Sequence, residues 1–160
     1  MREVQNKNQK LHMPTKCSKK IGRHGLSIGF LNIRSLSNKI DQVQIMIDKE
    51  NLDILFLNET WLKSHIEDSA LVIPGYSLYR NDRKTKNGGG VAAYVKETLN
   101  VTLRHDLSTM NDVEQIWIET NVKLIGDVLI GTIYRPPNCG DEYYDAMLDT
   151  LDTMSSEGKE

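Results

Sequence analysis

The chain has 160 residues, of which 39% are hydrophobic and 26% are charged, and its formal net charge at pH 7 is -2. This length suits one domain with a hydrophobic core, and the composition lies outside the range of disordered proteins. No apolar run is long enough to cross a bilayer or to form the core of a secretory signal, so we expect an intracellular protein with no membrane partner. Two cysteines are too few for a disulfide framework, and we expect free thiols.

Charge is segregated along the chain. Residues 1–24 carry seven Lys and Arg against one acid, which gives +6 and leaves -8 for the remainder. A basic, polar stretch with few residues to bury predicts a flexible leader, which either meets an anionic polymer or is solvated without a partner. The folded domain is therefore expected over residues 25–160.

The first expected elements are a strand, a helix and a second strand. Apolar runs at 26–32 and 52–57 predict buried strands, and the helical spacing over 40–47 predicts the helix between them. In such a unit the strands are parallel neighbours. Asn32 and Glu59 then meet at the carboxyl ends of the strands, where open sheets tend to place their ligands.

The second half of the chain is expected to be mostly β. Residues 76–80 and 91–95 predict a hairpin whose charged, glycine-rich tip is at 81–90. The strand at 114–122 alternates between two faces, and a later helix carries apolar residues at amphipathic spacing. An α/β sandwich, with a mixed sheet beneath helices, is the expected fold. The other expected elements are strands at 101–105 and 128–134, the first ending in His105, and the helix at 142–154 with Tyr143, Tyr144, Met147, Leu148 and Leu151 on its apolar face.

Polar residues at the strand ends define a candidate site. Glu59 ends an otherwise apolar strand, where a carboxylate must be paired or bound to a hard cation such as Mg²⁺. Asn32 has the groups to hold a metal-bound water, another acid or a phosphate oxygen, and Tyr134 offers a hydroxyl at the same edge. In the other interpretation Asn32 closes a turn, Glu59 caps a following helix and Tyr134 is core. The candidate phosphate contacts are Arg80, Arg83 and Arg135.

Six short motifs follow one another between residues 26 and 150. They are Leu31-Asn-Ile-Arg-Ser-Leu36 with Asn38-Lys39, Leu57-Asn-Glu-Thr-Trp-Leu62, Ile73-Pro-Gly-Tyr76, Tyr79-Arg-Asn-Asp-Arg83, Gly88-Gly-Gly-Val-Ala-Ala-Tyr94 and Ile133-Tyr-Arg-Pro-Pro-Asn138. In this order they resemble the front part of the endonuclease/exonuclease/phosphatase domain. More narrowly, they are similar to the apurinic-type endonuclease domain of LINE-like non-LTR retrotransposons.

The resemblance implies a fold and a reaction. The fold would be a four-layered α/β sandwich of the deoxyribonuclease-I type, in which two mixed sheets pack face to face. The reaction would be Mg²⁺-dependent hydrolysis of a DNA phosphodiester, with the nucleus as its location. By family, the residue at Asn32 helps hold the catalytic centre and its metal, Glu59 binds the metal, and Tyr134 touches the scissile phosphate. Trp61 is expected to cover the core. A phosphatase acting on inositol lipids or a nuclease acting on RNA fits the motifs less well.

Two elements of the family are absent from the chain. The Asp-x-Asn element that orients the nucleophile and the Ser-Asp-His element that activates water do not occur, and no histidine stands in the required context. We therefore expect a domain truncated at its carboxyl end, inactive by itself, with an open sheet edge. The alternative is a non-enzymatic nucleic-acid-binding remnant, although the acidity of the folded part speaks against strong DNA affinity.

Overall fold

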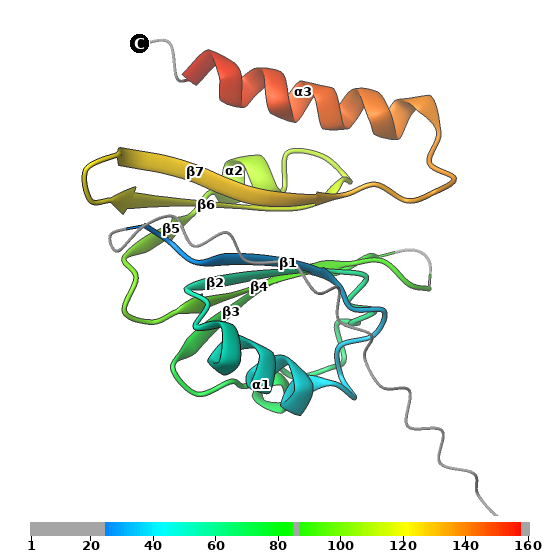
Figure 1. Ribbon diagram of the computed structural model, residues 1–160. Coiled ribbons are helices and arrows are strands. Elements are labelled where there is room, and N and C mark those ends of the chain that lie inside the picture. Colours follow the sequence, from blue (N-terminus) through cyan, green and yellow to red (C-terminus); the bar gives the residue numbers. More distant parts are fainter. Residues whose placement is uncertain (1–24, 85–86, 158–160) are drawn as a thin grey trace, which may run out of the picture.

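The computed structural model describes residues 25–84 and 87–157, so the basic leader predicted for residues 1–24 lies outside the described residues (Figure 1). None of the helices in these ranges is long and apolar enough to span a membrane. In chain order the elements are β1 (Ile28–Asn32), α1 (Ile40–Glu50), β2 (Ile54–Asn58), the 3₁₀ helix η1 (Asp68–Leu71), β3 (Tyr76–Asn81), β4 (Val91–Lys96), β5 (Val101–Leu103), α2 (His105–Ser108), β6 (Glu114–Val122), β7 (Gly126–Tyr134) and α3 (Asp141–Glu157).

The elements form four layers (Figure 1). Helix α1 covers one face of a sheet with strand order β1-β2-β4-β3, whose other face packs on a sheet of order β5-β6-β7, and α2 and α3 lie outside the second sheet. The predicted four-layered sandwich is confirmed. The first sheet is mixed, because β1 and β2 are parallel and its other pairs antiparallel. The second sheet was expected to be mixed too, but its described strands are all antiparallel, as short connections favour.

The predicted strand–helix–strand unit is confirmed and explains the first core. Helix α1 ends at Asn51, whose left-handed backbone (φ 47°) stops the helix and turns the chain into β2. Val43 and Ile47 of α1 then pack with Leu55 and Tyr94 from the sheet. Burial raises the pKa of Tyr94 to about 12, so its hydroxyl stays protonated at neutral pH. This core holds β1 and β2 rigidly side by side.

A second core fills the space between the two sheets. Phe56 and Ala93 of the first sheet contact Ile116, Ile118 and Tyr134 of the second. Since these side chains come from both sheets, the core fixes how β7 lies across β2. It thereby brings the end of β7 toward the end of β2, which the chain order alone does not determine.

Both faces of β6 are buried over residues 114–118, so the alternation of its sequence does not separate a buried face from an exposed one there. Gln115 is fully buried and Trp117 is 7% exposed, although both point away from the inter-sheet core. Gln115 Nε2 donates to Leu107 O (3.0 Å) and Thr150 Oγ1 (3.2 Å), and its Oε1 accepts from Trp117 Nε1 (3.1 Å). Because α2 and α3 cover this face, its polar groups are paired with one another rather than with water.

Two local predictions in the second half are wrong. His105 begins the short helix α2 instead of ending a strand. Tyr144, Leu148 and Leu151 were predicted on the apolar face of helix α3, but they are 48%, 40% and 42% exposed. The side of α3 that packs on the sheet is a different one, which contains the fully buried Thr150. In the part of the chain that the structure describes, β7 pairs on one side only, which fits the expected open sheet edge.

Candidate active site

One row of asparagines crosses the first sheet at the carboxyl ends of β1 and β2. The register pairs Asn32 with Asn58, Asn58 with Val91, and Val91 with Asn81. Asn58 Oδ1 accepts a hydrogen bond from the Thr132 hydroxyl of β7 (2.9 Å), so this row faces the second sheet. Asn32 is exposed at the β1 end of the row. The predicted meeting of the two strand ends is therefore present.

Glu59 follows this row directly and is partly buried. Its backbone oxygen accepts from Ser35 N–H (2.9 Å), which ties it to the loop after β1, and its Oε2 accepts from Trp61 Nε1–H (2.6 Å). No helix begins at Glu59, since the next helical turn, η1, starts only at Asp68. The interpretation of Glu59 as a helix cap is wrong. Among residues 25–84 and 87–157, Trp61 is the side chain that hydrogen-bonds its carboxylate, and it does so through Oε2.

The backbone around Glu59 is held in conformations that residues other than glycine rarely adopt. Arg34 (φ 46°), Ser35 (φ 77°), Glu59 (φ 60°) and Trp61 (φ 55°) all lie in the left-handed region. Such residues cost about 1–3 kcal/mol each and gather at ligand sites, where the surroundings must enforce them. Lys39 helps to stabilise this conformation, because its ammonium donates to Ile33 O (2.5 Å) and Arg34 O (2.7 Å).

The three-glycine run of the β3–β4 tip packs directly against this strained segment. Thr60 N and Trp61 N donate to Gly90 O (3.2 Å) and Gly89 O (2.8 Å). Gly88, Gly89 and Gly90 all have positive φ, and a Cβ on Gly90 would lie 2.6 Å from Thr60 Oγ1. Glycine is required here both for backbone conformation and for close approach. The hairpin tip therefore forms one wall of the site.

Tyr134 reaches the site from the second sheet, beneath Arg83. The tyrosine is 9% exposed and belongs to the inter-sheet core, and Arg83 Cζ lies 5.6 Å from the centre of its ring. Arg83 Nε donates to Glu114 Oε1 (2.5 Å), while its Nη2 is buried without a hydrogen-bond partner. This nitrogen is shielded from solvent and lies against Gly89, so it can donate to an anion only if the guanidinium turns toward the site.

Glu114 connects Arg83, Gly90 and Tyr143, and it was not predicted as a site residue. Besides Arg83, its carboxylate accepts the N–H of Gly90, and its backbone N–H donates to the Tyr143 hydroxyl (2.9 Å), which in turn donates to Tyr134 O (2.9 Å). Burial raises the pKa of Tyr143. The one signal in the sequence was an acid at the start of the strand predicted over 114–122.

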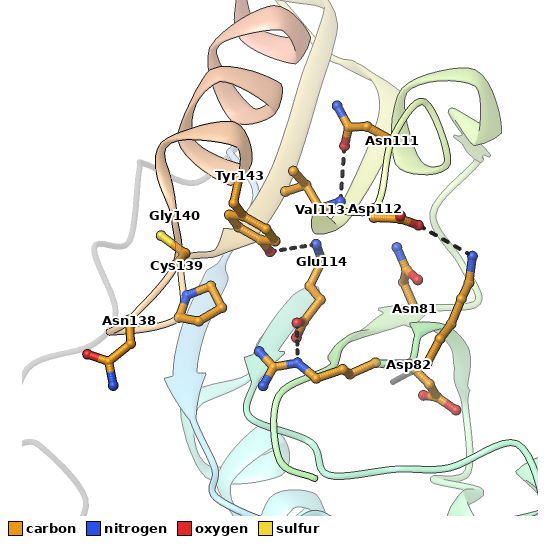
Figure 2. A pocket seen from close by; sticks show the side chains of 13 residues that line it. Asn81, Asp82, Asn111, Asp112, Val113, Glu114, Asn138, Cys139, Gly140 and Tyr143 are labelled. Atoms are coloured by element: carbon orange, nitrogen blue, oxygen red, sulfur yellow. Dashed lines mark hydrogen bonds and ion pairs between the residues drawn. The ribbon is translucent and has the colours of Figure 1, made fainter. Parts of the chain in front are cut away.

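A cavity of about 330 Å³ opens beside this network (Figure 2). The β3–β4 tip, the loop before β6 and the loop before α3 each supply part of its wall. Figure 2 shows Glu114 with Tyr143 above its carboxylate. That carboxylate accepts the hydrogen bond from Arg83 Nε. The cavity is large enough for a small anionic group next to Arg83.

The other two candidate phosphate contacts, Arg80 and Arg135, differ from Arg83 in how their guanidinium groups are placed. Arg80 uses all five of its donors on the fold: Asp82 and Asp68 accept three, and the backbone oxygens of Ile66 and Lys63 accept two. The structure leaves Arg80 no donor for phosphate, so the expectation of a phosphate contact there is wrong for this arrangement. Arg135 is exposed beside the end of β7.

Arg80→Lys is expected to lower the free energy of unfolding by about 2 kcal/mol, because an ammonium cannot reproduce the planar five-donor set. Arg135→Lys is the control and should change it by less than about 0.5 kcal/mol. Urea unfolding followed by circular dichroism measures both. Equal midpoints for the two variants would contradict the structural role of Arg80.

The donors at the strand ends fit a weakly held magnesium ion. In the described ranges no three or more His, Cys, Asp and Glu side chains gather as a metal cluster. Mg²⁺, however, keeps several waters and takes one or two carboxylates together with substrate phosphates. Glu59 Oε1, with the amide oxygen of the exposed Asn32 nearby on the paired strand end, is a donor set of that kind.

Residues 29–154 match the model of the Endonuclease/Exonuclease/phosphatase family, and the chain belongs to this family. The family predicted from the six motifs is thus confirmed. Among individual proteins, the chain is 27% identical over 115 residues to the RNA-directed DNA polymerase from mobile element jockey of Drosophila melanogaster. That match covers 70% of this chain and 12% of the Drosophila protein.

Solved structures share the fold at low identity. The 3′ phosphatase NExo from Neisseria, bound to a product DNA hairpin, superimposes with a TM-score of 0.57 at 20% identity, covering 82% of this chain and 53% of that one. A mannosyl-6-phosphatase from Bacteroides thetaiotaomicron gives 0.57 at 16% identity, covering 84% and 61%. This chain therefore spans between half and two thirds of the length of these two relatives.

Proposed function

We propose that this domain belongs to a DNA-nicking endonuclease of a LINE-like retrotransposon, that it acts on a phosphodiester with Mg²⁺ as cofactor, and that its site is the Glu59 edge. The observation that carries the proposal is Glu59 itself. A carboxylate is held at the end of β2 by a strained backbone, with Oε2 bonded to Trp61 and no hydrogen bond to Oε1 from the described residues. The likeness to the jockey protein supports the retrotransposon assignment.

Each residue has a separate role in this proposal. Glu59 and Asn32 would hold the ion, which when bound polarises a phosphoryl oxygen. Arg83 would turn its buried, unpaired Nη2 to a phosphate oxygen when substrate binds, and Arg135 would approach the substrate from the exposed end of β7. Tyr134 supports Arg83 from below and touches the phosphate with its hydroxyl. The chain carries neither motif that would activate water.

Metal binding can be tested with Tb³⁺, because its emission is excited by a nearby indole. Trp61 Nε1 lies 2.6 Å from Glu59 Oε2, and Trp117, the other tryptophan, is buried under α2 and α3. Wild type is expected to give Tb³⁺ emission that Mg²⁺ suppresses. Glu59→Gln should weaken Tb³⁺ binding by roughly tenfold or more, since it removes the charged ligand.

The matched control is Glu119→Gln, which removes a half-exposed acid of β6 that pairs with Arg104 (3.4 Å), and it should leave the titration unchanged. Equal Tb³⁺ affinity of the Glu59→Gln variant and wild type would overturn the assignment of the site.

A further inference from the structure

Trp61 lies where the sequence did not predict it. It was expected to cover the core, but it is 40% exposed and belongs to neither core cluster. Its indole Nε1–H donates to Glu59 Oε2 at 2.6 Å. A hydrogen bond to a carboxylate is short and stronger than a neutral one. The indole is therefore directed at the candidate metal ligand rather than at the core.

The backbone keeps this exposed hydrogen bond in place. A hydrogen bond in contact with water contributes little when two free side chains must be ordered to form it. Here Glu59 and Trp61 both have left-handed backbones. Ser35 N–H holds the Glu59 carbonyl (2.9 Å), and the Trp61 N–H is held by Gly89 O (2.8 Å). The directions of both side chains are thus set before the hydrogen bond forms.

Gly88 lies against the same pair. A Cβ on Gly88 would lie 3.4 Å from Trp61 Nε1 and 3.9 Å from Glu59 Oε2. Gly75 has an almost identical φ, +80° against +79°, but nothing lies within 4 Å of a Cβ added there. The two glycines therefore separate the backbone effect of an alanine from its effect on the indole.

We propose that Trp61 is a positioning residue, whose indole N–H fixes one oxygen of Glu59 and thereby presents the other to a divalent cation. The metal part of this inference rests on the function proposed above, whereas the Trp61–Glu59 bond stands on its own geometry. Outer partners that orient metal ligands typically change metal affinity 10–100-fold.

The bond itself can be tested by NMR without any metal. Two tryptophans give two indole N–H signals, and Trp117→Phe assigns the remaining one to Trp61. That signal is expected to lie downfield and to move upfield in Glu59→Ala. It should also move in Gly88→Ala and stay in place in Gly75→Ala. A Trp61 signal that does not respond to Glu59→Ala overturns the proposal.

The consequence for the metal is measured by Mn²⁺ titration followed by electron paramagnetic resonance. Trp61→Phe, which keeps an aromatic ring but lacks the donor, is expected to bind Mn²⁺ about tenfold more weakly. Gly75→Ala should match wild type. Unchanged affinity in Trp61→Phe overturns the positioning role. If wild type binds no Mn²⁺, the proposed function fails, and the indole signals still decide whether Trp61 fixes Glu59.

Discussion

The 160-residue chain, expressed by itself, is expected to nick supercoiled plasmid DNA in Mg²⁺ no faster than background. It carries Glu59, Asn32, Tyr134 and Arg83, but neither the Asp-x-Asn nor the Ser-Asp-His element of the family. Catalytic groups that act as a unit also fail as a unit, so the expected rate loss is roughly 10⁴- to 10⁶-fold. Binding of the ion and of phosphate does not compensate, because neither activates the attacking water.

Conversion of supercoiled plasmid to open circles, followed on a gel over hours, measures this rate. The matched control is the Glu59→Ala variant prepared in the same way. Robust nicking by wild type that disappears in Glu59→Ala would show that the chain is competent and would refute the prediction. Nicking that is equal in both preparations comes from a contaminating nuclease, and purification until it disappears leaves the expected result.

Glu114→Ala is expected to lower the free energy of unfolding by about 3–5 kcal/mol, the usual cost of removing one partner of a buried ion pair. Glu114 is 6% exposed and accepts from Arg83 Nε and from the Gly90 N–H. Without Glu114 the Arg83 guanidinium has no counter-charge, and its Nη2 already lacks a hydrogen-bond acceptor. It also frees the glycine run that packs against the Glu59 segment.

The control for Glu114→Ala is Asp112→Ala on the same loop. Asp112 has a side chain that is 98% exposed and lies 3.9 Å from Lys84 Nζ, so its removal should cost less than about 1 kcal/mol. Chemical unfolding of both variants gives the comparison. Equal losses would mean that Glu114 is not the buried link between the hairpin tip and β6. Adding Arg83→Met to Glu114→Ala should recover part of the stability, because it removes the unpaired charge.

Periodicity predicted the first half of the fold well. The β1–α1–β2 unit and the β3–β4 hairpin follow from apolar spacing, from the helix stop at Asn51 and from the glycine run at 88–90. These features depend on residues close together in the chain. The second half was predicted less well, because burial on both faces of β6 depends on α2 and α3. A strand covered on both sides needs apolar or paired side chains on each face, so a simple alternation is misleading.

The sequence by itself determined the family, the four-layered sandwich, and the meeting of Asn32 with the Glu59 segment at neighbouring strand ends. Parallel strands joined by a helix can meet in few other ways. Only the tertiary structure decided which arginine spends all its donors on the fold and which keeps one unpaired. Arg80 and Arg83 are three residues apart in one motif. The guanidinium of Arg80 donates to acceptors in residues 63–68 and to Asp82, whereas Arg83 keeps a buried, unpaired donor beside Tyr134.

Trp61 shows the same difference between what the sequence predicts and what the tertiary structure decides. Its place two residues after Glu59 is evident from the sequence, but a left-handed backbone at both residues is needed to direct the indole at the carboxylate. That conformation is enforced by hydrogen bonds from the loop after β1 and from Gly89, which are distant in sequence. Local pattern predicts which elements form and in what order. Packing of distant segments decides which donors and acceptors remain free for a ligand.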